Sequence, residues 1–138
     1  MKICGIEIKS NEAILAVCSV DGENVTFQNT DPKKVALKIE EQDFYREFLN
    51  VVSEFMSAQE IDKVYLRKPI EKGKQISGAN AFRIEALLNL LDIPIISIHP
   101  SSVTKYIKIE GNAILGKNEA YAYQNGALDT LYYGIRKK

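Results

Sequence analysis

The sequence has few of the residues from which many metal sites and disulfide frameworks are built. Its single histidine, His99, excludes a multi-histidine metal site. Its two cysteines, Cys4 and Cys18, are too few for a disulfide framework and do not have the spacing of a zinc site. We therefore expect both to be buried, reduced thiols that behave as small hydrophobic side chains.

Apolar segments long enough to span a membrane are also missing. No apolar run approaches the roughly 20 residues that a membrane-spanning helix needs. The N-terminal stretch does not have the basic-then-apolar layout of a signal peptide, because Glu7 and Lys9 interrupt it. The expectation is therefore a cytoplasmic protein with no membrane partner.

An excess of charge of either sign is absent as well. Lys and Arg total 18, as do Asp and Glu, so no global electrostatic attraction draws the chain to nucleic acid. Balanced totals do not exclude a local basic patch. The 138 residues are 46% hydrophobic and 26% charged, which fits a single globular domain over residues 1–138.

The first 20 residues contain two long apolar segments that predict a pair of strands joined by a turn at Ser10 and Asn11. Within the first segment, Glu7 stands between two isoleucines. A carboxylate inside such a strand is costly unless a metal ion, a basic side chain or water accompanies it. The functional question is whether a metal ion, a basic side chain or water accompanies Glu7.

The remaining chain alternates between strand and helix patterns. Asp21-Gly22 is a hairpin signal that leads into a third strand at residues 25–27, and residues 29–38 have the composition of a loop. Further strands are predicted at residues 61–66 and 93–98, and helices at residues 41–58, 79–92, 101–107 and 119–135. This order predicts an α/β fold with a mixed five-stranded sheet, three antiparallel strands followed by parallel strands, flanked by helices.

This order of elements resembles the ribonuclease H-like fold, and three motifs resemble those of RuvC-type Holliday-junction resolvases. Gly-Ile-Glu at residues 5–7 is similar to their strand-one motif, which usually reads Gly-Ile-Asp. Residues 62–66, with the basic loop and the Gly/Ala-containing helix that follow, resemble their fourth strand and next helix. Asp-Thr-Leu at residues 129–131 resembles their C-terminal Asp-Ala-Leu. The whole chain resembles a small bacterial family of unknown function assigned to this fold, with Lys-Gly-Lys at residues 72–74.

The resemblance implies a metal site. Nucleases of this superfamily hold two Mg²⁺ ions between carboxylates on the first strand, the fourth strand and the last helix. It implies that Glu7 and Asp129 are the catalytic residues and the ligands of Mg²⁺ or Mn²⁺. Two departures stand against this: Arg67 takes the place of the fourth-strand glutamate, and Gly126 takes the place of a second helix aspartate. Two of the four expected carboxylates are therefore present.

Glu7 and Asp129 each have two interpretations. Glu7 is either a ligand of metal or substrate, or a carboxylate paired with Arg67 across neighbouring strands. Asp129 shares a helix face with Asn125, one turn earlier, so it either faces Glu7 across a site or lies on the polar flank of the helix.

Two other groups of residues bear on the partner. The basic group is the candidate contact for the phosphate backbone of DNA or RNA, or else a solvated loop. Its members are Lys63, Arg67, Lys68, Lys72, Lys74 and Arg83, and we expect nucleic-acid contacts from the last five. The last helix carries Tyr121, Tyr123, Tyr132 and Tyr133, which favour a core or a homodimer interface over base stacking.

Three functional hypotheses follow. The first is a RuvC-like protein that binds nucleic acid and has a degenerate metal site. The second is a Mg²⁺-dependent, structure-selective nuclease similar to Holliday-junction resolvases. The third is a non-catalytic, dimeric interaction protein. A salt bridge between Arg67 and Glu7 would favour the first hypothesis over the second, whereas a close pair of carboxylates with a raised pKa would favour the second.

Overall fold

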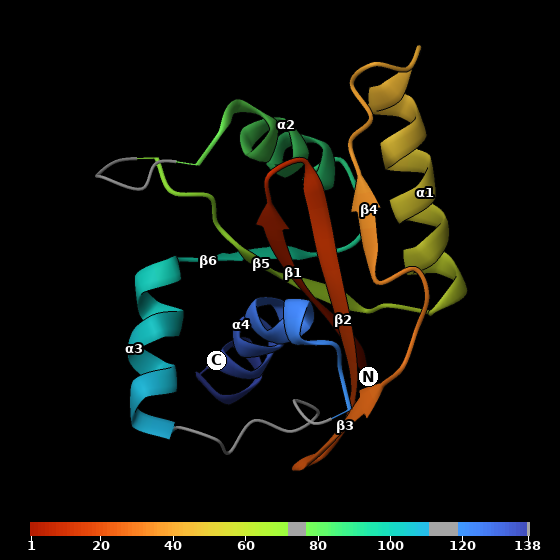
Figure 1. Ribbon diagram of the computed structural model, residues 1–138. Coiled ribbons are helices and arrows are strands. Elements are labelled where there is room, and N and C mark those ends of the chain that lie inside the picture. Colours follow the sequence, from red (N-terminus) through yellow and green to blue (C-terminus); the bar gives the residue numbers. More distant parts are fainter. Residues whose placement is uncertain (72–76, 111–118, 138) are drawn as a thin grey trace.

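The computed structural model describes residues 1–71, 77–110 and 119–137, and its centre is a six-stranded mixed sheet (Figure 1). The strand order is β3-β2-β1-β5-β6, with β4 also paired to β2. β1, β3 and β4 each pair with β2 in antiparallel fashion, and β5 and β6 continue the sheet in parallel from β1. The strands are β1 (Lys2–Lys9), β2 (Glu12–Asp21), β3 (Asn24–Gln28), β4 (Lys34–Ala36), β5 (Lys63–Arg67) and β6 (Ile95–Ile98).

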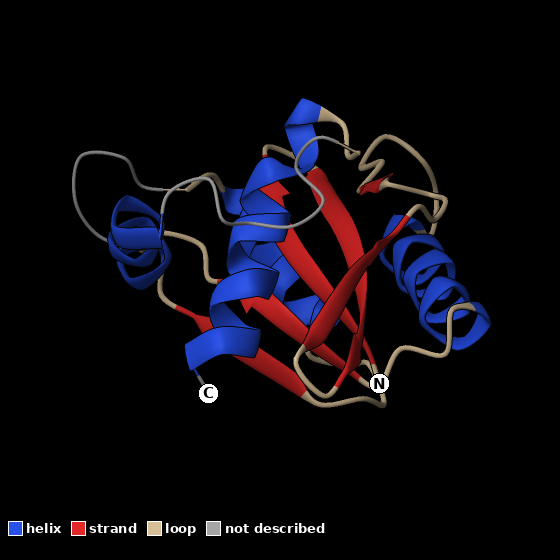
Figure 2. Cartoon of the chain, turned by 90° about the horizontal axis from the view of Figure 1, so that it is seen from below, coloured by secondary structure: helices blue, strands red, loops and turns tan. Residues whose placement is uncertain are grey.

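Helices cover both faces of this sheet (Figures 1 and 2). One face carries α1 (Phe44–Ala58) and α2 (Ala79–Leu88), and the other carries α3 (Pro100–Glu110) and α4 (Asn125–Lys137). The predicted α/β fold is therefore confirmed, with three antiparallel strands followed by two parallel ones, and β4 is a sixth strand beyond the predicted five. Of the described helices, none is long and apolar enough to cross a membrane.

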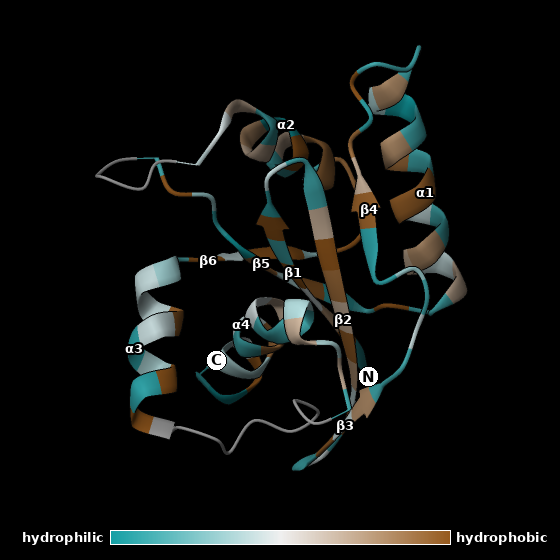
Figure 3. Cartoon of the chain, viewed as in Figure 1, coloured by the Kyte–Doolittle hydropathy of each residue, from teal (hydrophilic) through white to brown (hydrophobic). Residues whose placement is uncertain are grey.

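The period-two alternation of the strands divides the hydrophobic residues into two cores, and these residues follow the middle strands (Figure 3). Cys4 and Ile6 of β1 face α1 and α2, whereas Ile3 faces α4. Gly5 lies on the α4 side, where an added Cβ would overlap Leu131 and the carbonyl of Ala127. The α4 backbone therefore rests directly on β1, which places the start of this helix over the polar end of the strand.

Three elements differ from the sequence prediction. β4 forms within the segment predicted as a loop, because Val35 fills a place in the core beside β2. The continuous apolar run at residues 93–98 is typical of a strand buried on both faces, but β6 is an edge strand, with Ile96 41% exposed. The last helix, predicted from residue 119, begins at Asn125; Asn118, whose side chain suits a helix cap, lies outside the described residues.

The late start of α4 has a local cause in the 3₁₀ turn Ala122–Gln124 that precedes it. The buried Gln124 side chain donates from Nε2 to the carbonyl of Leu15 at 2.9 Å. Its Oε1 accepts a hydrogen bond from the backbone N–H of Tyr121 at 3.0 Å. These bonds fix the turn on β2 before the helix begins, since a buried amide needs partners for both of its polar atoms.

Both cysteines are buried and free, as predicted. Cys4 faces the α1–α2 core and Cys18 the α3–α4 core, so the two thiols lie on opposite faces of the sheet. Burial raises the pKa of each thiol to about 12. The cysteines therefore serve packing and supply no reactive thiolate at neutral pH.

Candidate functional site

The candidate site lies where β1 and β5 end beneath the start of α4. These two strands are parallel neighbours, with Ile6 paired to Leu66, so Glu7 and Arg67 follow at adjacent positions. Both leave the sheet on the α4 face, because side chains alternate along a strand. The parallel register of β1 and β5, together with this alternation, thus brings a carboxylate and a guanidinium together.

Two basic side chains accompany the Glu7 carboxylate. Nη1 of Arg67 lies 3.8 Å from Glu7 Oε2, and Nζ of Lys9 lies 3.8 Å from Oε1. The Glu7 side chain is 14% exposed and that of Arg67 24%, so this is a largely buried pair. Lys9 reaches Glu7 because it stands two positions further along β1 and so shares its face.

The N-terminal turn of α4 closes the site from above. Gly126 packs against Glu7 so closely that an added Cβ would occupy the place of the carboxylate. Asn125 and Asp129 flank this contact from one face of the helix, and the charge of Asp129 acts on Glu7. The two expected carboxylates are therefore brought together, beside two basic residues.

The pKa of Glu7 lies above its ordinary value. Burial of the carboxylate is the main cause. The positive charges of Lys9 and Arg67 act in the opposite direction, and the negative charge of Asp129 adds to the rise. The site thus disfavours an ionised Glu7 in spite of its two basic neighbours.

This raised pKa predicts how the stability of the protein depends on pH. The native state holds the Glu7 proton more tightly than the unfolded chain does, so its contribution to stability is present at low pH and is lost as pH rises through the raised pKa. We expect wild type to lose free energy of unfolding relative to Glu7→Gln as pH rises, measured by urea unfolding across a pH series. If the free energy of unfolding of wild type instead rises relative to that of the variant, the positive charges of Lys9 and Arg67 outweigh the effect of burial on the pKa of Glu7.

The oxygen atoms that the site offers as metal ligands are enough for one hard cation at most. Glu7 Oε1 and Asn125 Oδ1 are buried, and neither has a hydrogen-bond donor among the described residues. With a carboxylate oxygen of Asp129 they would form the all-oxygen ligand set that Mg²⁺ and Mn²⁺ prefer. No cluster of three or more acidic, histidine or cysteine side chains fit for a metal occurs in the described part of the chain, and the positive charge of Arg67, 3.8 Å from Glu7, opposes the binding of a second cation.

The predicted nucleic-acid residues divide between the site and the surface. Arg67 faces Glu7. The side chain of Lys68, in contrast, is 41% exposed, and its Nζ lies 4.0 Å from Oε1 of Glu71 on the loop after β5. Arg83 is exposed on α2, where its Nη1 donates to Asn80 at 2.7 Å. Lys72 and Lys74 lie outside the described residues.

Lys63 does not join this group. It stands at the opposite end of β5 from Arg67, with its Nζ 5.3 Å from the centre of the Tyr65 ring. His99, the other residue noted in the sequence, is exposed and lies 3.4 Å from the Ser101 hydroxyl, at the rim of a hollow of about 420 Å³ beside Lys68.

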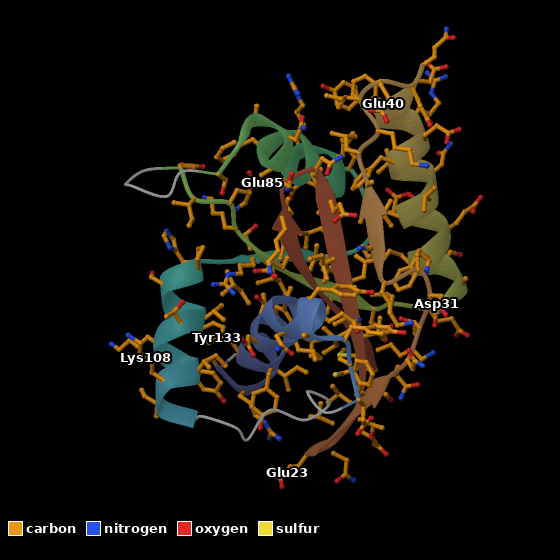
Figure 4. All side chains as sticks on the ribbon, viewed as in Figure 1. Glu23, Asp31, Glu40, Glu85, Lys108 and Tyr133 are labelled. Atoms are coloured by element: carbon orange, nitrogen blue, oxygen red, sulfur yellow. The ribbon has the colours of Figure 1, made fainter. Side chains whose placement is uncertain are left out.

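The four tyrosines near the C-terminus have two different environments. Tyr132 is 9% exposed, and Tyr133 meets the edge of Tyr106 at 5.5 Å between α3 and α4 (Figure 4). These two belong to the core, as predicted. Tyr121, in contrast, is 59% exposed and stacks on Tyr123 ahead of the helix.

Sequence reasoning missed two members of the site. Lys9 could have been found from the alternation of β1, since it follows Glu7 by two positions. The contact of Gly126 with Glu7 had no sequence signal, because residues more than 100 positions apart meet there only through the packing of α4 on β1.

Solved structures of Holliday junction resolvases are similar to this chain over nearly its whole length. RuvC from Thermus thermophilus has a TM-score of 0.70 and 13% identity, covering 99% of this chain and 97% of its own. The same enzyme in complex with Holliday junction substrate has a TM-score of 0.67 and 13% identity, covering 98% and 95%. The fowlpox virus resolvase has a TM-score of 0.54 and 12% identity, covering 99% and 97%.

Identities this low show the fold alone, which is the RuvC-like, ribonuclease H-like fold. Within it, the chain belongs to the family described as Protein of unknown function (DUF3010), whose model matches residues 1–134. No curated protein sequence matches the chain.

Proposed function

We propose that this protein binds nucleic acid with a RuvC-like fold whose metal site is degenerate. The observation that carries the proposal is the Arg67–Glu7 ion pair of 3.8 Å. A guanidinium at the position of a metal-ligating glutamate repels the cations that such a glutamate would hold, and it supplies a fixed positive charge instead.

The same guanidinium suits a phosphate. Arg presents five donors in a planar fork that fits phosphate oxygens, and its side chain here is still 24% exposed. Lys9, 58% exposed, adds a second positive charge beside it. A phosphate at this point would be held by two basic residues without a metal ion.

Branched DNA is the first ligand to test, since the structurally similar RuvC has been solved with a Holliday junction. Lys68, which directly follows β5 and has a side chain 41% exposed, and the exposed Arg83 of α2 are proposed to contact further phosphates. The cytoplasmic location and the homodimer remain predictions from the sequence.

The test measures binding of a fluorescein-labelled four-way junction by anisotropy in EDTA, at several salt concentrations. We expect binding without metal, and Lys68→Ala and Arg83→Ala should each lower the slope of log K against log salt by about one. Glu23→Ala, a change of one charge at the distant β2–β3 turn, is the control. No binding in EDTA contradicts the proposal.

A Mg²⁺-dependent nuclease is the second candidate. It is favoured by the raised pKa of Glu7 beside Asp129, whose cause is chiefly burial, and by the buried Oε1 of Glu7 and Oδ1 of Asn125. Calorimetry with Mn²⁺ on wild type and Glu7→Ala separates the candidates. Binding by wild type alone, together with junction cleavage in Mn²⁺, would establish the nuclease.

A further inference from the structure

A second surface lies beside the candidate site, and we name it the tyrosine–lysine patch: Lys33, Lys34, Tyr121 and Tyr123. The two tyrosine rings are stacked, with centroids 5.4 Å apart and planes at 7°. Nζ of Lys34 lies 5.0 Å from the centre of the Tyr123 ring, and Nζ of Lys33 lies 5.6 Å from that of Tyr121. Tyr121 nevertheless remains 59% exposed.

Strand register connects this patch to the candidate site. Glu7 of β1 pairs with Ile14 of β2, and Ile14 pairs with Lys34 of β4. Directly paired residues point to the same face of a sheet, so Lys34 and Glu7 share the α4 face. Two strand spacings separate their backbones by about 10 Å, a distance that a few nucleotides of a single strand can span.

The patch is held in place from beneath. Backbone N–H groups of Tyr121 and Gln124 bond within the 3₁₀ turn, and the Gln124 side chain ties that turn to β2. These bonds do not involve the Tyr121 ring. An exposed ring on an anchored backbone is a preformed platform, so little conformational entropy is lost when a planar group stacks on it.

The charges of the patch cancel. Nζ of Lys33 donates to Asp31 at 2.7 Å, on the loop between β3 and β4 (Figure 4), and Nζ of Lys34 lies 4.0 Å from Glu12. Because each lysine has its own carboxylate, the patch has little net attraction for phosphates. What it offers is an exposed aromatic surface, which stacks on bases irrespective of their sequence.

We propose that Tyr121 stacks an unpaired base of a nucleic-acid strand whose phosphate lies at Arg67 and Lys9. This inference rests on the proposed function and names the form of its ligand, a single-stranded segment. The Glu7 site holds the backbone, and the tyrosine–lysine patch holds a base a few nucleotides away.

The experiment compares fluorescein-labelled oligothymidylate with an abasic oligomer of the same length and charge. Wild type should bind oligothymidylate about tenfold more tightly, because only the first oligomer has bases to stack. Tyr121→Ala should reduce that ratio to about one by weakening only the oligothymidylate complex, and Tyr121→Phe should keep it. Stacking should also quench tyrosine emission, which no tryptophan masks in this chain.

The matched control is Tyr45→Ala, which removes another exposed tyrosine, 42% exposed, from α1 on the opposite face of the sheet. It should leave the ratio unchanged. If wild type binds neither oligomer, the proposed function and this inference both fail. If it binds both equally well, or if Tyr121→Ala leaves the ratio as it was, the stacking inference alone is overturned.

Discussion

Gly126→Ala is expected to lower the free energy of unfolding by about 2 kcal/mol, because the new methyl group has no space beside Glu7. The carboxylate carbon and both its oxygens occupy the position of that Cβ. Either α4 must lift from β1 or the Glu7 side chain must leave its place near Arg67. Each movement disturbs a closely packed contact.

A double-mutant cycle isolates this contact. In the Glu7→Ala background the space opposite residue 126 is empty, and alanine favours a helix over glycine by up to about 1 kcal/mol. Gly126→Ala should therefore change from destabilising to neutral or stabilising once Glu7 is truncated. Urea unfolding of the four proteins gives the coupling energy.

Equal effects of Gly126→Ala in both backgrounds would contradict the contact. Glu7→Asp refines the test, since its carboxylate is one methylene closer to β1. We expect Gly126→Ala to cost less in this background than in wild type, and more than in the Glu7→Ala background.

This contact gives a physical reason for two departures from the RuvC-type pattern at once. The resemblance implies an aspartate at position 7 and a second aspartate at position 126. Glu7 reaches further than an aspartate and fills the space that a side chain at 126 would need, so the longer acid requires glycine at that position.

The second large effect is expected from Arg67→Glu. This change replaces the guanidinium 3.8 Å from Glu7 with a carboxylate and so gathers three acidic side chains around one point. Without metal, the variant should be less stable than wild type by about 2–4 kcal/mol, because it loses an ion pair and gains like-charge repulsion in a largely buried site. With Mn²⁺ present, much of that loss should be recovered.

Calorimetry measures the gain directly. We expect Arg67→Glu to bind Mn²⁺ at least about tenfold more tightly than wild type, or about 1.4 kcal/mol. Lys68→Glu is the matched control, since it makes the same change in net charge at the next position, where the side chain pairs with Glu71. Equal gains in both variants would assign the effect to net charge, and no gain in either would show that the site does not accept a divalent ion.

Local sequence patterns determined most of the fold. The alternation of apolar residues defined the strands, and the apolar face of α1, with Phe48, Val52 and Phe55 buried, identified that helix within three residues of its start. Period-two alternation also determines which sheet face Glu7 and Arg67 each occupy, whereas their ion pair forms only because β1 pairs with β5. These features depend on residues near one another in sequence, whose preferences are set by local geometry and burial.

Tertiary structure alone decided the rest. Two contacts depend on how α4 and the 3₁₀ turn before it pack against β1, β2 and β4. They are the contact of Gly126 with Glu7 and that of Lys34 with Tyr123. The short strand β4 likewise exists because β2 offers it a partner. Packing between distant segments sets these distances to within an ångström, whereas sequence patterns specify only which face a residue occupies.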